Sequence, residues 1–246
     1  MEKTNKLGRN RTGIDMSPIH SKEMISGAET LTPPTQSDFP PLMVIEREYI
    51  EEGGTVGSVP VPGTMKGVLK STMEKMTGHN PEVLLNKMGE RLAFERSGVR
   101  LYEAFIIKCE SINLPTPISL DILQQFRAEE EQHFHTIKNA MLSMGADPTA
   151  QTPDADVVAV ASMGIQKVIQ DPRTSLSQCL SALLTAELVD NAGWEILIKL
   201  AEGLGLEQIT ADFVKPLQEE EKHLQTIREW YEYAVMAEAG KKLTKH

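Results

Sequence analysis

The pattern of hydrophobic and polar positions divides the chain near residue 80. Residues 1 to about 40 mix Asn, Thr, Ser, Lys and Pro without hydrophobic periodicity, a composition typical of disorder. A short apolar stretch at 42–45 is followed by Gly and Pro punctuation up to position 63. Apolar residues at helical spacing over 64–77 indicate a short amphipathic helix. They are Met65, Val68, Leu69, Met73 and Met76. Residues 1–79 therefore form a mostly irregular, partly disordered extension in this interpretation.

Beyond this extension the sequence predicts four long helices. Asn80 followed by Pro81 is typical of a helix N-terminus, and Gly145 and Gly205 favour helix ends. Pro216 predicts a kink or a break in the last helix. The expected helices span 80–111, 119–143, 175–204 and 207–239.

The connections between these helices differ in length. The turn at 113–117 contains two prolines and ends the first helix. The connection at 145–174 is long, and its segment 154–170 can itself form a helix. The sequence thus predicts an all-α domain at 80–239, followed by a basic tail at 240–246.

Composition and charge exclude several classes of function. A chain of 246 residues can hold one domain of about 150 residues plus extensions. The net charge of −10 argues against nucleic-acid binding, because a phosphate backbone would repel it. The two cysteines, Cys109 and Cys179, lie far apart in apolar surroundings, which predicts buried thiols rather than a disulfide framework or a zinc ribbon. No hydrophobic run approaches a membrane span and the N-terminus has no apolar signal core, so we expect a cytoplasmic protein.

Two segments of the expected helices are near copies of each other. Residues 129–138 read EEEQHFHTIK and residues 219–228 read EEEKHLQTIR, so each contains Glu-x-x-His. Residues i and i+3 share one face of a helix, so a carboxylate and an imidazole project together, twice. This arrangement suits a site for two metal ions inside a four-helix bundle.

A second repeat supplies further carboxylates. Glu95 is followed after seven residues by Tyr102, and Glu187 after seven residues by Trp194. Seven residues are close to two helical turns, so each pair shares a face. The copies are offset by 92 residues for the single Glu (187 minus 95) and by 90 for the Glu-x-x-His motif (220 minus 130). Two helical hairpins of matched length explain both offsets.

Over roughly residues 80–239 this constellation resembles the ferritin-like di-iron carboxylate proteins: ferritins, bacterioferritins and rubrerythrins. In that family one Glu comes from each of two helices and a Glu-x-x-His from each of the other two, often with a long crossover between the second and third helices. The resemblance implies two iron ions, or manganese, because carboxylate and imidazole ligands suit either metal. The implied ligands are Glu95, Glu130, His133, Glu187, Glu220 and His223.

The resemblance also suggests roles for neighbouring residues. An aromatic residue seven positions after the first Glu is frequent in the family, so we expect Tyr102 to be a core residue that also donates a hydrogen bond near the metals. Asp190 lies where rubrerythrin-like proteins can carry an extra carboxylate, but it is one methylene shorter than Glu. We therefore expect Asp190, like Asn191, to tune the site rather than to bind metal directly. Trp194 is expected in the core.

Other polar residues of the two motifs receive ordinary interpretations. Neighbouring glutamates are expected to be solvated and to form surface salt bridges. These are Glu129, Glu131, Glu219 and Glu221. His135 has no counterpart in the second copy, where Gln225 stands, and is expected at the surface.

The preferred functional hypothesis is a di-iron oxidoreductase of ferroxidase or peroxidase type that reduces O2 or H2O2 while Fe(II) is oxidised. Rubrerythrins usually carry a four-cysteine rubredoxin module, which this chain lacks, so an external electron donor is implied. The alternatives are iron storage or handling, a manganese catalase-like enzyme, a metal-free interaction module, and an oxygenase acting on an organic substrate. The oxygenase would need an apolar pocket near Gly98, Ala192 and Gly193. We expect a homodimer or higher homo-oligomer.

Overall fold

The structure, a computed structural model, describes residues 18–31, 39–61, 63, 80–112 and 117–240. Within these residues the chain is all-helical, with seven helices and no strand. The chain divides into two compact units, one at Asn5–Thr55 and one that begins at Val56. None of the described helices is both long enough and apolar enough to cross a membrane.

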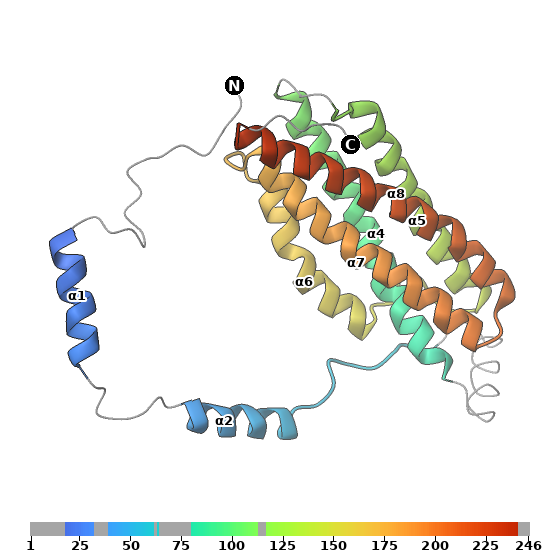
Figure 1. The fold of residues 1–246 in the computed structure, drawn as a ribbon. Helices are drawn as coiled ribbons and strands as arrows, with labels where there is room; N and C mark the ends of the chain where they lie inside the picture. Colours follow the sequence, from blue (N-terminus) through green and yellow to red (C-terminus); the bar gives the residue numbers. More distant parts are fainter. Residues whose placement is uncertain (1–17, 32–38, 62, 64–79, 113–116, 241–246) are drawn as a thin grey trace. The chain divides into compact units, whose positions relative to one another are not determined.

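The N-terminal unit contains two helices that the sequence pattern did not predict. They are α1 (Pro18–Thr30) and α2 (Phe39–Glu52) (Figure 1). The expectation of disorder up to residue 40 and of an irregular stretch after it was therefore wrong at these positions. Two prolines directly after Phe39 fit the first turn of α2, where backbone N–H groups have no partner inside the helix. No described side chain of this unit is buried. The helix expected at 64–77 and most of the basic tail lie outside the described residues.

Four long helices in the second unit lie close to the predicted ranges. They are α4 (Pro81–Glu110), α5 (Leu120–Ser143), α7 (Leu176–Gly203) and α8 (Glu207–Glu238). Ser119 and Ser175 cap α5 and α7 through their side chains, whereas Asn80 makes no side-chain capping bond. Gly145 and Gly205 follow α5 and α7 with φ of 81° and 65°, a left-handed conformation that glycine adopts without strain.

The long connection between α5 and α7 carries a helix of its own. This helix, α6 (Pro153–Gln170), is capped by the Thr152 side chain and packs against both α4 and α7. Thr152 fills the space where a side chain on Gly89 would stand, and Asn86 accepts a hydrogen bond from the Asp154 backbone. The connection therefore covers the α4–α7 side of the unit.

Helix α8 continues through Pro216, which is buried. The break that the sequence predicted at this proline is absent from the described helix. The Glu-x-x-His motif that follows Pro216 therefore lies on the same continuous helix as the residues before it.

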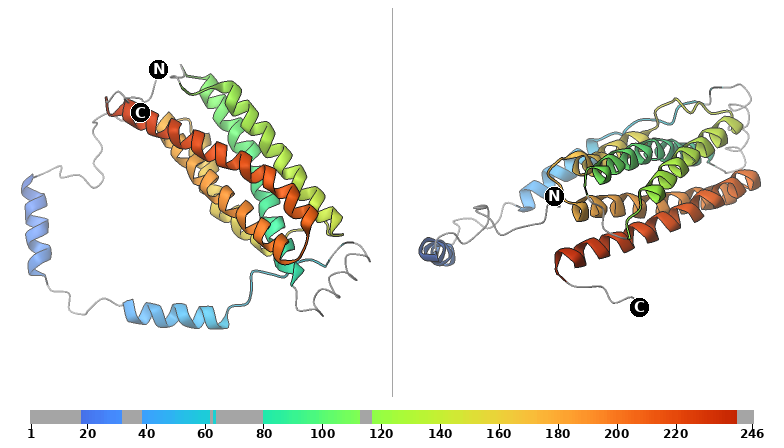
Figure 2. Two further views of the ribbon diagram at one scale, coloured as in Figure 1. Left: turned by 45° about the vertical axis from the view of Figure 1, so that its right-hand side comes forward. Right: turned by 90° about the horizontal axis from the view of Figure 1, so that it is seen from above.

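The four long helices lie alongside one another (Figures 1 and 2). Helix α4 packs against α5 and α7, and α8 packs against α7 and α5. Two apolar clusters fill the interior. On α4, buried residues from Leu84 to Leu92 belong to one cluster and those from Phe94 to Cys109 to the other. On α7 the change from one cluster to the other falls between Ala186 and Trp194. On every long helix the junction of the two clusters coincides with the predicted ligand positions.

Candidate metal centre

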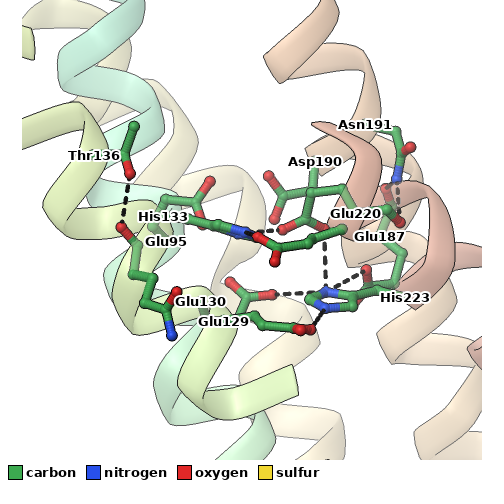
Figure 3. Close-up of polar contacts among 12 residues, drawn as sticks. Glu95, Glu129, Glu130, His133, Thr136, Glu187, Asp190, Asn191, Glu220 and His223 are labelled. Atoms are coloured by element: carbon green, nitrogen blue, oxygen red, sulfur yellow. Dashed lines mark hydrogen bonds and ion pairs between the residues drawn. The ribbon is translucent and has the colours of Figure 1, made fainter. Parts of the chain in front are cut away.

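All six predicted ligands converge at this junction. Glu95 comes from α4, Glu130 and His133 from α5, Glu187 from α7, and Glu220 and His223 from α8 (Figure 3). None is more than 2% exposed. Burying four carboxylates and two imidazoles in an apolar interior is costly unless cations or protons compensate the charge. The group therefore requires a compensating partner.

The six residues form two overlapping groups whose ligand atoms lie within metal-binding distance. Within each group, one atom from every residue lies within 4.8 Å of those of the others. The first group is Glu95, Glu130, His133 and Glu220, and the second is Glu130, Glu187 and His223. Because Glu130 belongs to both groups, its carboxylate can reach two cations.

Distances around the imidazoles place Glu220 between the two groups as well. His133 Nδ1 lies 2.8 Å from Glu220 Oε1 and 3.6 Å from Glu95 Oε2. His223 Nδ1 lies 3.5 Å from Glu220 Oε2, 3.7 Å from Glu130 Oε1 and 3.9 Å from Glu187 Oε2. Both Nδ1 atoms thus face the carboxylates at the centre.

Each imidazole is held from behind by the opposite motif. His133 Nε2 on α5 contacts Glu219 Oε2 on α8 at 3.1 Å, and His223 Nε2 on α8 contacts Glu129 Oε2 on α5 at 2.7 Å. A carboxylate acceptor fixes which nitrogen carries the proton and leaves Nδ1 for the centre.

The expectation that Glu129 and Glu219 are solvated neighbours was therefore wrong. Their shared position, one residue before each ligand Glu, was the sequence signal for this role. Glu131 and Glu221, one residue after each ligand Glu, are exposed as expected, and so is His135.

Tyr102 and Asn191 contact the α7–α8 side of the centre. The buried Tyr102 hydroxyl donates to Glu187 Oε1 at 2.5 Å, so this phenol contacts a candidate ligand as the sequence suggested. Asn191 Nδ2 donates to the backbone oxygens of Glu187 and Glu220 at 2.9 and 3.0 Å. It joins the backbones of the two helices rather than contacting the ligand carboxylates.

Asp190 is buried and forms an ion pair with Arg91, a residue that the sequence pattern did not single out. Arg91 Nη1 donates to Asp190 Oδ1 and lies 3.7 Å from Glu95 Oε1, and Arg91 is only 1% exposed. The guanidinium also packs over the Phe94 ring, 4.5 Å from its centroid. Arg91 precedes Glu95 by one helical turn, so their shared face was the available signal.

Two glycines make room for side chains of the centre. A Cβ on Gly98 would overlap the Glu130 carboxylate, and a Cβ on Gly193 would lie 2.5 Å from Arg91 Nη2. The space that Gly98 leaves is thus taken by Glu130 rather than by a substrate pocket.

Aromatic rings cover both imidazoles. Trp194 meets the His133 ring edge to face, with centroids 5.7 Å apart, and Phe126 lies 4.0 Å from the His223 ring. Trp194 is fully buried, as predicted for a core aromatic. Cys109 and Cys179 are also buried free thiols, as expected.

Protons compensate the charges of the centre in the absence of cations. Burial alone lowers the pKa of His133, but the nearby Glu220 and Glu95 carboxylates raise it to about 11. Burial and the nearby Glu220 raise the pKa of Glu130 to about 8, and the pKa of Glu187 rises for the same reasons. Although burial raises the pKa of Glu220, close contact with the His133 and His223 imidazoles lowers it to about 2. Bound cations would replace several of these protons.

No protein-family model matches the chain, and comparison with curated proteins and with solved structures gave no match either.

Proposed function

We propose that α4, α5, α7 and α8 form a ferritin-like four-helix bundle that holds two metal ions, most naturally iron. The observation that carries this proposal is a cluster of unpartnered polar atoms. Among the described residues, ten buried side-chain nitrogen or oxygen atoms make no hydrogen bond of regular geometry, and eight of them belong to the six candidate ligands. The eight include His133 Nδ1 and Glu220 Oε1, which approach each other to 2.8 Å at the centre. Buried polar atoms are nearly always partnered in proteins, so eight convergent exceptions favour a missing cation.

In this proposal Glu130 and Glu220, which lie between the two ligand groups, would help to hold both ions. Glu95 and His133 would hold one of them, and Glu187 and His223 the other. Four carboxylates offset the charge of two divalent cations, and this oxygen and nitrogen ligand set suits iron or manganese.

Two ferrous ions held there would supply the electrons that reduce O2 or H2O2. The protein residues have separate tasks. Glu129 and Glu219 orient the imidazoles, and the apolar clusters exclude bulk water. Burial and the nearby Glu187 raise the pKa of Tyr102 well above its usual range, so its hydroxyl keeps its proton and donates it in a hydrogen bond to Glu187. An external electron donor would return the centre to its starting state.

Metal content tests the proposal directly. The full chain, purified without chelator, should contain about two iron atoms per chain, the number that the di-iron ligand pattern holds. Glu130→Gln should lose both, because this carboxylate belongs to both groups. Glu131→Gln is the matched control, because the next residue along α5 is exposed.

Each other result has a defined meaning. Two manganese atoms would favour the catalase-like alternative. Absence of bound metal after anaerobic addition of Fe(II) or Mn(II) would overturn the proposal. Iron-loaded protein that consumes neither O2 nor H2O2 would leave iron handling as the function.

A further inference from the structure

Helix α6 turns an apolar side away from the rest of its unit. It packs against α4 and α7, outside the four long helices (Figure 1). Between Asp156 and Lys167 it carries no charged residue, and Val160 and Met163 are 71% and 50% exposed. The solvent-facing side of a surface helix is usually charged or polar. The composition of this side therefore indicates a surface that another molecule covers.

Four exposed residues follow one line along this side. They are Asp156, Val160, Met163 and Lys167, separated by four, three and four residues. This is the seven-residue spacing that keeps the side chains of one helix facing a partner helix. The line begins with an acidic side chain and ends with a basic one. Asp156 Oδ1 accepts a hydrogen bond at 2.8 Å from the Gln151 amide, and this neutral donor does not compensate the charge of Asp156.

The line is complementary to itself when it is reversed. A twofold axis through its midpoint places Asp156 opposite Lys167 of a second copy, and Lys167 opposite Asp156 of the second copy. The same axis places Val160 opposite Met163 of the second copy. Each charge thus meets its opposite, and each apolar residue meets an apolar residue. A contact that uses the same patch on both copies is the kind that closes a twofold dimer.

We propose that two copies of the chain associate through α6, packed antiparallel about this axis. Val160 and Met163 of both copies would form the apolar centre of the contact, with an ion pair between Asp156 and Lys167 at each end. Val157, which is 52% exposed, lies beside the line and extends the apolar centre. Helix α6 supplies none of the six candidate ligands, so this surface is separate from the candidate metal centre.

Charge favours a second copy over other partners. A partner surface of one charge sign would match one end of the line and repel the other end. A parallel pair would place Asp156 opposite Asp156 and Lys167 opposite Lys167, and like charges facing each other across an interface are unfavourable. Helix α6 has 18 residues and is about 27 Å long. A contact of this size is small, so the dimer should be weak and reversible.

Sedimentation of the metal-free full chain over a range of concentrations tests the inference. We expect a reversible equilibrium between monomer and dimer. Val160→Glu should weaken the dimer tenfold or more, because it places two carboxylates at the apolar centre of the contact. The exposed Val160 side chain contributes little to the fold, so the circular dichroism spectrum should not change. Val214→Glu on α8 is the matched control, since Val214 is also exposed, and should dimerise like the unaltered chain.

Charge reversal tests the antiparallel arrangement. Lys167→Glu and Asp156→Lys should each weaken the dimer tenfold or more, because each places like charges at both ends of the contact. Mixed in equal amounts, the two variants should form a heterodimer, because the acidic side chains of one copy then face the lysines of the other at both ends. Lys199→Glu, at an exposed position of α7, is the control and should leave the dimer unchanged.

Three outcomes would overturn the inference: a chain that stays monomeric at every concentration, an unchanged dimer in Val160→Glu, or no association in the mixture of the two folded charge variants. If Asp156→Lys fails to fold, the Val160→Glu result decides. None of these measurements depends on bound metal. The metal content of the unaltered chain is measured separately, so the dimer and the proposed function can fail independently.

Discussion

The two halves of the candidate centre have equivalent ligands but different surroundings. Glu95 and His133 repeat as Glu187 and His223, and each imidazole pairs with a glutamate of the opposite motif. Around the first half lies a buried ion pair, whereas the second half has the Tyr102 phenol.

The ion pair beside the first half, Arg91 with Asp190, has no counterpart at the equivalent positions of the sequence repeat. Arg91 corresponds to the buried Leu183 at the 92-residue offset, and Asp190 corresponds to Gly98. The repeated positions therefore supply the candidate ligands, whereas positions that differ between the two copies, such as Arg91 and Asp190, supply the side chains around them. Five predictions test this division, from the largest expected effect to the smallest.

Gly98→Ala should abolish binding of both metal ions. The new Cβ would overlap the Glu130 carboxylate, which belongs to both ligand groups. Gly164→Ala is the control, because a Cβ there meets open space, and it should stabilise α6 by roughly 0.5–1 kcal/mol. Metal analysis and urea denaturation provide the measurements. Retention of two ions in Gly98→Ala would contradict the expected displacement of the Glu130 carboxylate.

Arg91→Leu should destabilise the protein by about 3–5 kcal/mol, because it leaves Asp190 buried without its cation. The double variant Arg91→Leu with Asp190→Ala approaches the arrangement of the other half and should regain much of this loss. The free energy of unfolding from urea titration measures both. Equal destabilisation by the single and double variants would contradict the pairing.

Lowering the pH should weaken metal binding in both halves. Without metal, the pKa values of His133 and Glu130 are raised to about 11 and about 8, so both carry protons below pH 8. A metal ion must displace these protons, and each costs roughly tenfold in affinity per pH unit. Affinity at the Glu95–His133 position should therefore fall roughly 100-fold between pH 7 and pH 6. A pH-independent affinity in competition titrations would exclude this coupling.

Glu219→Gln and Glu129→Gln should each weaken one metal position, since each removes the carboxylate behind one imidazole. A loss of about 10–100-fold in affinity is typical for such contacts. Stepwise titration should show one weakened step in each variant and two in the double variant. Glu221→Gln, an exposed neighbour, should change neither step. Equal weakening of both steps by one substitution would contradict the separation into halves.

Tyr102→Phe should lower affinity at the Glu187–His223 position by roughly tenfold, the cost of about 1–2 kcal/mol for a lost hydrogen bond to a buried carboxylate. The corresponding substitution in the other half, Trp194→Phe, removes packing against His133 but no hydrogen bond to a ligand. Its effect should appear in stability rather than in the metal isotherm. An unchanged isotherm for Tyr102→Phe would show that the phenol has no role at the centre.

The repeat predicted the six ligand positions, but not Arg91, which has no counterpart, nor the contacts of Glu129 and Glu219 with the imidazoles. The convergence of Glu95, Glu130, His133, Glu187, Glu220 and His223 followed from two helical periods and one offset. Arg91 was missed because a lone arginine on a helix is usually solvated, whereas here it is buried beside Gly193 and Asp190 of α7. Helix α2 was missed because the Gly and Pro residues after it obscured its boundaries. Pro216 predicted a kink or a break, but α8 runs without a break from Glu207 to Glu238.

The crossed pairs His133–Glu219 and His223–Glu129 have a mechanical consequence. They join α5 to α8 at two points about one helical turn apart. In one pair the imidazole comes from α5 and the carboxylate from α8, and in the other pair the roles are exchanged. Sliding one helix past the other by a single turn, about 5.4 Å, would break both ties together. The two pairs therefore fix the axial alignment of α5 against α8, and they do so without a bound cation.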